Sequence, residues 1–477
     1  MTAELIDRLR AEITAGPVLG PGDDGFADEV AAQNTAVRHA PDVAVGISSE
    51  QDAAAVVRIA ASAGVPVRVL ATGHGSAVPV ADGILVTTRR LGGVSIDVSR
   101  RIAQIGAGCR WAEVIAAAAG HGLAPVAGAS DNVGCIGYTT GGGLGPLART
   151  FGFSSDWARS FRLVTADGEV RTASAEENPD LFWALRGGKS GFGIVTSMDF
   201  ELVPLSTLYA GTLFFDADQI ARAFGAWVDW TKTLPETATS SAIILRLPPL
   251  EVIPEPLRGK TVLGVRFAYV GEGAGRASAG GGETAAGTAG RDLAREGERL
   301  LQPMRDVATV LIDSVQDMPA SRIADIHNDP RDPGPGWDRG QLLTDLDADF
   351  VNTFLGVAGP DQQVPFVAIE IRHLGGAVAR DVPEGSAVGG RGAAYTLILI
   401  GVPDPALFDT VLPPAAEALL APLQPWISPE HNVNYAGGLT VPGSYEACWP
   451  AEIFQRLAEI RSTYDPTGVF PYGPPER

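Results

Sequence analysis

The chain has 477 residues, of which 45% are hydrophobic and 19% are charged, and its net charge is −20. This size and composition predict a well-packed protein of two domains, because a single core would be unusually large. The acidic balance argues against nucleic acid or an anionic membrane as a partner, since phosphate groups would be repelled.

Three widely spaced cysteines, Cys109, Cys135 and Cys448, do not resemble a disulfide framework and predict a reducing compartment. The first residues, MTAELIDRLRAEI, predict an amphipathic helix and not a signal peptide. No apolar run reaches the roughly 18 residues that a membrane span needs. We therefore expect a cytoplasmic protein without a membrane segment.

The first two hundred residues alternate short helices and strands. Ser49 and Asp52 resemble a capping box, and Gly64 with Pro66 ends the helix predicted over 48–64. The interleaving lacks strict βαβ repetition, so a plain Rossmann sheet is not the best fit. Further predictions are strands over 67–71, 84–88, 94–97, 102–107 and 194–202, a helix over 111–119, a hairpin at 163–172 and a short helix capped by Ser174.

After residue 204 the pattern changes to longer strands, predicted over 212–215, 241–247, 261–270 and 394–402. They indicate a second, antiparallel sheet, with helices over 217–233 and 292–304 on one face and a last helix over 449–464. The Gly/Ala-rich segment 271–290 cannot bury enough apolar surface to order itself, so it predicts a mobile surface insertion.

Two glycine-rich stretches, RVLATGHGS at 68–76 and GASDNVGCIGYTTGGGLG at 128–145, each follow an apolar run. Backbone without side chains lets amides approach an anion such as a diphosphate. The second stretch is not the dinucleotide fingerprint, however, and a tight turn between packed elements explains it as well. A lone histidine such as His74 is more often a structural hydrogen-bonding group than a catalytic one, but its neighbours Gly73 and Gly75 shift that balance because they lack side chains that would bury it.

The order of the longer motifs is more specific. VRVLATGHGS, the stretch at 128–145, NPDLFWALRGG with GFGIVTS, then VNYAGG and YDPTGVF resemble the berberine-bridge-enzyme-like (BBE-like) flavoproteins of the vanillyl-alcohol-oxidase or PCMH-type FAD superfamily. The resemblance is dense over 41–205 and returns at 432–470. It implies an α+β fold with a two-subdomain FAD-binding domain at 1–207, whose PCMH-type core covers about 38–207. A substrate domain at 208–430 would have a large antiparallel sheet covered by helices, and the segment 431–477 would return to the FAD domain.

The resemblance also implies how FAD is held. His74 falls where the family attaches the flavin 8-methyl carbon to a histidine, and neutral imidazole is a competent nucleophile for that carbon. The loop amides of Thr72, Gly73, Gly75 and Ser76 would hold the diphosphate. The remaining cleft residues implied are Gly134, Gly137, Tyr138, Gly142, Gly143, Ile194 and Asn434.

Many relatives have a second link through a cysteine, where this chain has Ser130. Cys135 falls at a family position for small apolar residues, so we expect it to be a buried side chain and predict one covalent link only. Val133 falls beside the reactive edge of the flavin, where a small side chain leaves room for O2 and favours an oxidase.

Tyr435 matches the family tyrosine that faces the flavin from the substrate side. A phenolate there, or a phenol kept close to ionisation by a neighbour, could accept the substrate proton. The alternative is a tyrosine that only packs on the ring. Glu370 and Arg372 share one face of a predicted strand, with His373 on the other, and either contact substrate or face solvent. We place the substrate cleft between 241–246 and 368–374, and predict no metal site.

Three functions remain open from the sequence. The leading one is an oxidase that passes hydride from a C–H next to O or N of a small organic substrate to flavin N5, with O2 reduced to H2O2. The second is a dehydrogenase with another acceptor, and the third is a redox-neutral cyclase or binding protein with FAD as scaffold. A natural-product substrate is suggested only by analogy at the level of the fold.

Overall fold

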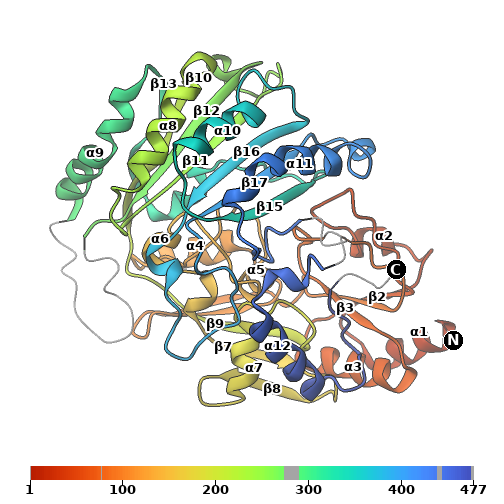
Figure 1. Cartoon of the computed structure of the whole chain (residues 1–477). Coiled ribbons are helices and arrows are strands. Elements are labelled where there is room, and N and C mark those ends of the chain that lie inside the picture. Colours follow the sequence, from red (N-terminus) through yellow and green to blue (C-terminus); the bar gives the residue numbers. More distant parts are fainter. Residues whose placement is uncertain (1, 77, 273–288, 438–442, 474–477) are drawn as a thin grey trace.

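The computed structural model describes residues 2–76, 78–272, 289–437 and 443–473, and this part of the chain contains three β-sheets (Figure 1). The predicted α+β class is confirmed. The predicted mobile insertion at 271–290 lies, but for its two ends, outside the described residues.

The N-terminal sheet has the strand order β1-β2-β4-β3, in which β2, β4 and β3 are parallel. The predicted helix cap is confirmed: the Ser49 hydroxyl accepts from the amide of Asp52, and Gly64 ends the helix with φ +63°. The elements are α1 (Thr2–Glu12), β1 (Val18–Leu19), α2 (Phe26–Glu29), β2 (Val43–Gly46), α3 (Glu50–Ala63), β3 (Val67–Leu70) and β4 (Ile84–Thr87).

The second sheet is antiparallel, in the order β5-β6-β9-β7-β8. One prediction here is wrong: Ser174 does not cap the following helix, which begins at Pro179. The Ser174 hydroxyl instead accepts from the amides of Glu176 and Glu177 in a preceding turn. The elements are β5 (Val94–Asp97), β6 (Ile102–Gly106), α4 (Trp111–Ala119), α5 (Cys135–Thr140), α6 (Ala148–Phe151), β7 (Ala158–Val164), β8 (Val170–Ser174), α7 (Pro179–Leu185), β9 (Ile194–Glu201) and the C-terminal α12 (Ala451–Tyr464), which packs beside α7.

The third sheet is the largest, with the order β13-β10-β12-β11-β16-β17-β15 and β14 paired to β10. The predicted strand at 212–215 extends back to residue 207, because its first half pairs with β14. The elements are β10 (Thr207–Asp216), α8 (Ile220–Thr231), β11 (Ala238–Arg246), β12 (Thr261–Tyr269), α9 (Ala289–Val307), β13 (Val310–Asp313), β14 (Gln316–Pro319), β15 (Asp338–Leu343), α10 (Ala348–Ala358), β16 (Phe366–His373), β17 (Tyr395–Gly401) and α11 (Leu412–Leu420).

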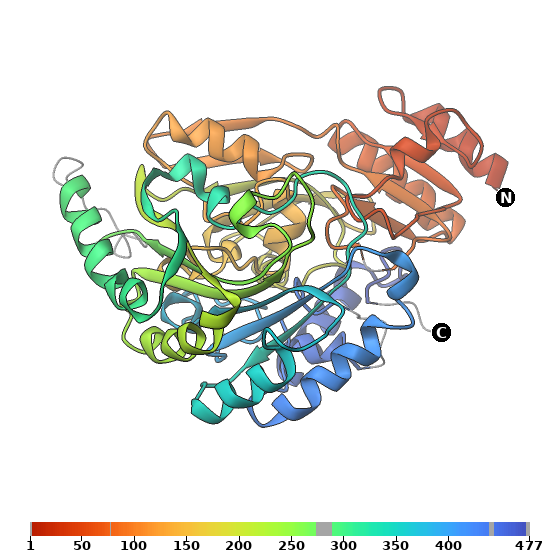
Figure 2. The same cartoon turned by 90° about the horizontal axis from the view of Figure 1, so that it is seen from above.

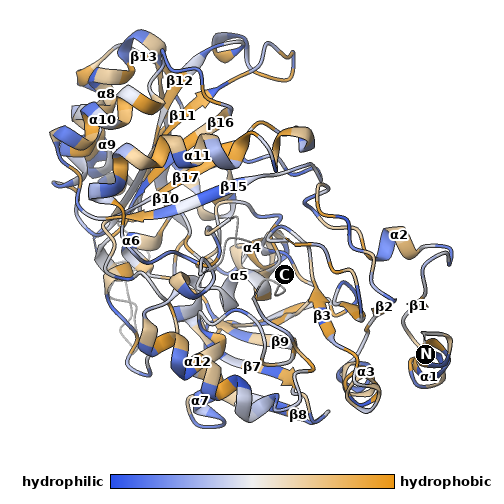
Figure 3. Cartoon of the chain, turned by 45° about the vertical axis from the view of Figure 1, so that its right-hand side comes forward, coloured by the Kyte–Doolittle hydropathy of each residue, from blue (hydrophilic) through white to orange (hydrophobic). Residues whose placement is uncertain are grey.

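Helices α8 to α11 cover one face of this large sheet, and the other face is turned toward the first two hundred residues (Figure 2). Strand alternation separates the two faces: Ile369 and Ile371 of β16 pack with the helices, in a cluster that includes Phe350 and Phe354. The hydrophobic character of β11, β12 and β16 is visible in Figure 3. Glu370 and Arg372 therefore point to the opposite, inner face.

Arg149 of α6 joins the two halves of the molecule from a buried position, 6% exposed. Its guanidinium donates to the carbonyl oxygens of Ala238 at 2.9 Å and Leu234 at 3.2 Å, and also to that of Leu374. It lies 2.9 Å from Nε2 of His373. One side chain thus satisfies several buried acceptors of the large sheet and its connections.

Replacing Arg149 with Met should destabilise the protein by about 2–4 kcal/mol, because several buried carbonyl groups would lose their donor. The measurement is chemical denaturation followed by circular dichroism. Arg295→Met is the matched control, since that side chain is 80% exposed and, within the described residues, forms an ion pair only with Asp292. If Arg149→Met lowered the free energy of unfolding by less than about 1 kcal/mol, the hydrogen bonds of Arg149 would not be part of the cooperative fold.

Candidate functional site

The two glycine-rich stretches lie against each other. Nε2 of His74 lies 3.2 Å from the carbonyl oxygen of Asn132. A Cβ at Gly134 would stand 3.2 Å from the side chain of Thr72. Arg110 donates to the same Asn132 carbonyl at 2.6 Å. The loop that follows β3 and the loop before α5 therefore form one site.

His74 is held as a neutral imidazole. Burial lowers its pKa below the ordinary 6.5, and the positive charge of Arg110 acts in the same direction. A carbonyl oxygen only accepts, so the contact with Asn132 assigns the ring proton to Nε2. Nδ1 then keeps its lone pair, which is the form of histidine that can act as a nucleophile.

A cavity of about 590 Å³ opens beside this loop. Both glycine stretches contribute to it, through Gly75 and Ser76 from the first and Gly137 from the second. An added Cβ at Gly75 or Gly137 would meet no atom within 4 Å, so the backbone itself faces the open space. This size is typical of nucleotide and cofactor sites, and the exposed backbone fits a diphosphate.

Four other residues predicted for the cleft do not line this cavity: Gly73, Gly142, Gly143 and Ile194. Gly73 has φ +74°, and a Cβ there would come within 2.4 Å of Ala32. Gly142 and Gly143 form a buried turn with φ of +96° and +78°. Ile194 is fully buried in the N-terminal core, whereas its neighbours Gly193 and Val195 line the cavity.

Tyr138 does not line the cavity either, and belongs to the core of the second sheet. Its ring packs edge-on against Trp111 with the centroids 6.0 Å apart, and its hydroxyl is buried. Its backbone carbonyl accepts from Nδ2 of Asn434 at 2.9 Å. The backbone amide of Asn434 in turn donates to Oδ1 of Asn432 at 3.0 Å. The segment near the C-terminus is thereby attached to the second glycine stretch.

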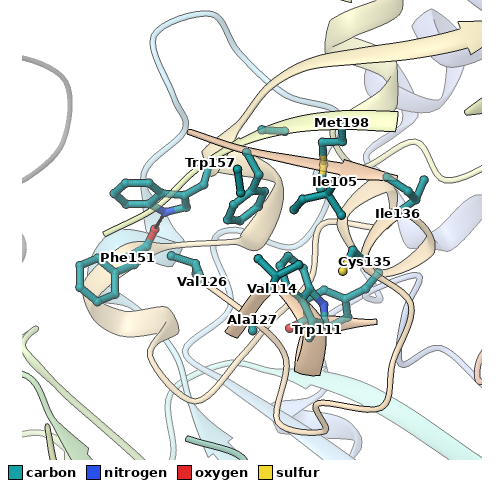
Figure 4. Packing of buried hydrophobic residues seen from close by; sticks show 14 of the residues in the cluster. Ile105, Trp111, Val114, Val126, Ala127, Cys135, Ile136, Phe151, Trp157 and Met198 are labelled. Carbon is teal, nitrogen blue, oxygen red and sulfur yellow. Dashed lines mark hydrogen bonds between the residues drawn. The ribbon is translucent and has the colours of Figure 1, made fainter. Parts of the chain in front are cut away.

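Ser130 and Val133 are half-buried and belong to the loop whose Asn132 carbonyl contacts His74. Cys135 is fully buried in the core of the second sheet, next to Trp111 and Ile136 (Figure 4). Burial raises the pKa of its thiol well above the ordinary 9.0. The expectation that Cys135 is a buried small side chain is confirmed.

Tyr435 joins the large sheet to the second glycine stretch. Its hydroxyl donates to the carbonyl of Leu144 at 2.9 Å and accepts from Nη1 of Arg372 at 3.1 Å. Burial raises the pKa of Tyr435 above 10, and the charge of Arg372 only partly offsets this. The hydroxyl is thus protonated at neutral pH, which differs from the expectation of a phenol near ionisation.

Glu370 accepts from Arg372 at 2.9 Å and 2.8 Å, which confirms that the two share a face. Burial disfavours its charge, but the guanidinium groups of Arg372 and Arg266 outweigh this and hold the pKa of Glu370 well below its ordinary 4.5. A carboxylate so strongly paired is a poor proton acceptor. Glu370 positions Arg372, which in turn reaches Tyr435.

Sequence reasoning missed three partners of Glu370. Arg266 approaches its Oε1 to 2.5 Å, the Ser241 hydroxyl donates to the same oxygen at 2.7 Å, and Nε2 of His327 lies 3.5 Å away. The sequence did contain a signal for the Arg266 and Ser241 contacts, because β11 and β12 each have a polar residue at an inward-facing position. In the strand register Arg266 pairs with Ser241, and Ser241 pairs with Arg372.

Between this cluster and Leu144 lies a second cavity of about 20 Å³, room for roughly one water. Of the two ranges predicted for the substrate cleft, Ser241 and residues 372–374 line it, with His327 beside them. Burial lowers the pKa of His327 to about 4, so this imidazole is neutral. The crevice suits a water, not a substrate.

Lys189 is the other residue that sequence reasoning missed. It lines the large cavity, and its Nζ donates to the carbonyl of Gly137 and to Oδ1 of Asn434, both at 2.7 Å. The signal was a lysine inside the glycine-rich run GGKSG.

Within the described ranges, no group of three His, Cys, Asp or Glu residues is arranged to hold a metal ion. Of the helices in that part of the chain, none is long and apolar enough to cross a membrane.

Comparison with known proteins finds sequence similarity in the first part of the chain. Residues 41–174 match the FAD binding domain family. The chain is 29% identical over 233 residues to the FAD-linked oxidoreductase YgaK of Bacillus subtilis, a match that covers 47% of this chain and 52% of that protein. The chain thus spans about half the length of this relative.

Three solved structures share the fold over nearly the whole chain. They are 6-hydroxy-D-nicotine oxidase of Arthrobacter nicotinovorans (TM-score 0.78, 23% identity, 96% and 97% of the two chains covered), BBE-like 1 of Physcomitrella patens (0.79, 18%, 98% of each) and glucooligosaccharide oxidase of Acremonium strictum (0.75, 19%, 97% and 98%). The FAD of the last is described as 6-S-cysteinyl and 8α-N1-histidyl. The fold implied by the resemblance to BBE-like flavoproteins is confirmed.

Proposed function

This chain carries an FAD binding domain on the fold of the BBE-like flavoproteins, and we propose that it is an FAD-dependent oxidase of a small organic substrate. The observation that carries the proposal is the neutral His74 held against Asn132 beside the 590 Å³ cavity. When bound, FAD supplies a hydride acceptor at N5 and a centre that O2 reoxidises with formation of H2O2.

We further propose that His74 is the single covalent attachment of FAD. Support comes from its protonation, which leaves Nδ1 free, and from the histidyl link described for glucooligosaccharide oxidase. That enzyme also has a cysteinyl link, but this chain has Ser130 at the position that resembles it, and the Cys135 thiol is buried. The backbone of Gly75, Ser76 and Gly137 would hold the diphosphate.

On the substrate side, Tyr435 is proposed to contact the substrate and, in its phenolate form, to accept the substrate hydroxyl proton while hydride leaves the neighbouring carbon. Arg372 lies 3.1 Å from the tyrosine hydroxyl and lowers the energy of its phenolate. Glu370 holds Arg372 from behind and is a positioning residue.

The half-buried Val133, next to Asn132, favours O2 as the acceptor because its side chain is small. A dehydrogenase with another acceptor, or a redox-neutral protein with FAD as scaffold, are the other candidates. We place the protein in the cytoplasm and leave a natural-product substrate as a proposal by analogy of fold.

Acid precipitation should leave the yellow colour with the protein, and peptide mass spectrometry should find flavin on the peptide that contains His74. His74→Ala should release the flavin. Because burial lowers the pKa of His74 below 6.5, the reactive neutral form persists at weakly acidic pH. The rate at which apoprotein acquires covalent FAD should therefore be nearly constant from pH 8 to 6.5 and fall only below that.

The control for this experiment is Cys135→Ser, which should keep the full amount of bound flavin. Flavin mass on the peptide with Cys135, or colour retained in His74→Ala, would disprove the single link.

Oxygen reactivity can be measured without knowing the substrate. Photoreduced protein mixed with air-saturated buffer in a stopped-flow instrument should reoxidise within seconds and release one H2O2 per flavin. Val133→Leu should slow reoxidation by about tenfold or more, because a larger side chain closes the approach to the reactive edge. Reoxidation of the unmodified protein over many minutes would favour the dehydrogenase.

With any substrate that reduces the flavin, Tyr435→Phe should slow anaerobic reduction by about 10²–10⁴-fold, the range for loss of a general base. Since burial raises the pKa of Tyr435 above 10, the phenolate fraction grows with pH and the reduction rate should rise from pH 7 to 9.5. If flavin reduction in Tyr435→Phe showed the same pH profile as in the unmodified protein, the acceptor of the substrate proton would be another group. Product formed with the flavin kept reduced under anaerobic conditions would favour the redox-neutral alternative.

A further inference from the structure

Lysine is rare in this chain, and one of its three lysines differs from the others. The exposed Lys232 lies 3.8 Å from Asp229, and the half-buried Lys260 lies 2.6 Å from Asp216. Lys189 has no carboxylate within ion-pair distance among the described residues. In the part of the chain that the structure describes, its ammonium group donates only to the neutral oxygens of Gly137 and Asn434. Lys189 is half-buried, and a cation that has lost part of its solvation without gaining an anion is unfavourable unless a ligand supplies the charge.

The backbone also indicates that this side chain is needed. Lys189 has φ +68°, a conformation that glycine adopts more easily, and Gly187, Gly188 and Gly191 surround it. A lysine there costs on the order of 1 kcal/mol of backbone strain. A fourth glycine would remove that cost, so the lysine is retained against the local conformational preference.

The loop that carries Lys189 is fixed on both sides. The Lys189 amide donates to the carbonyl of Thr140 at the end of α5, at 2.9 Å. From α12, Arg461 donates to the carbonyls of Ser190 at 3.0 Å and Gly188 at 2.8 Å. The ammonium group therefore has a defined place in the wall of the 590 Å³ cavity, which Gly75 and Ser76 also line.

We propose that Lys189 pairs with the negative charge of bound FAD. The inference rests on the part of the proposed function that places FAD in this cavity, and not on oxidase activity. Two groups of FAD share the required chemistry: the diphosphate, and the N1–C2=O edge of the isoalloxazine, which gains negative charge when the ring is reduced. The low pKa of Lys189 without a ligand, about 8, agrees with a cation whose partner comes from outside the chain.

The test compares His74→Ala, in which FAD is exchangeable, with His74→Ala/Lys189→Met and His74→Ala/Lys189→Arg. His74→Ala/Lys232→Met is the matched control at the surface. Apoprotein is titrated with FAD, the melting temperature is measured with and without FAD, and the flavin midpoint potential is measured against a reference dye.

If the diphosphate is the partner, Lys189→Met weakens FAD binding by about tenfold or more and reduces the rise in melting temperature that FAD causes. If the ring edge is the partner, affinity for oxidised FAD is kept and the midpoint potential falls. Lys189→Arg should restore either property in part. The proposal is overturned if Lys189→Met changes neither property, or no more than Lys232→Met does.

The two proposals fail separately. If His74→Ala still carries covalent flavin, the His74 link is wrong, and the Lys189 effect is then measured as the midpoint potential and melting temperature of Lys189→Met in the unmodified protein. A purely structural role for Lys189 would lower the melting temperature of the apoprotein itself and leave the increment due to FAD unchanged.

Discussion

The close approach of two backbone segments, 72–76 and 132–137, is the constraint on which the rest of the site depends. At Gly73 a Cβ would overlap Ala32, and at Gly134 it would press on Thr72. Absence of a side chain at these positions lets His74 reach the carbonyl of Asn132. The same glycine character leaves backbone exposed along the cavity. One packing requirement therefore produces both the position of the imidazole and the open wall beside it.

The second half of the molecule is attached to this site by buried polar groups and not by an apolar seam alone. Arg149 satisfies carbonyls of the large sheet, and Glu370 gathers Arg266 and Arg372 on its inner face. Buried ion pairs of this kind add little net stability, but an arrangement that left one of the charges without its partner would be strongly destabilised. They therefore favour one arrangement of the two halves. Nη1 of Arg372 donates a hydrogen bond to the hydroxyl of Tyr435. This hydroxyl in turn donates to the carbonyl of Leu144 in the second glycine stretch.

Local signals in the sequence predicted the local structure well. The cap at Ser49 and the stop at Gly64 predicted α3, and α4 and β5 have the predicted bounds. Features that depend on distant partners could not be predicted in this way. The extension of β10 needs β14, the charge state of Glu370 needs Arg266 more than a hundred residues earlier, and the protonation of Tyr435 follows from burial. Ser174 shows that local patterns can also mislead. The capping pattern at Ser174 belongs to a turn, and the helix that follows begins only at Pro179.

Burial explains the two proposed cofactor contacts together. His74 and Lys189 both lose solvation, and in each case burial lowers the pKa. For histidine, whose ordinary pKa is already near neutrality, this removes the charge and leaves a nucleophile. For lysine, a pKa of about 8 still leaves roughly nine-tenths of the side chains protonated at pH 7. Partial burial of the two side chains thus leaves a neutral ring for bond formation and a cation for charge pairing, because their ordinary pKa values are about four units apart.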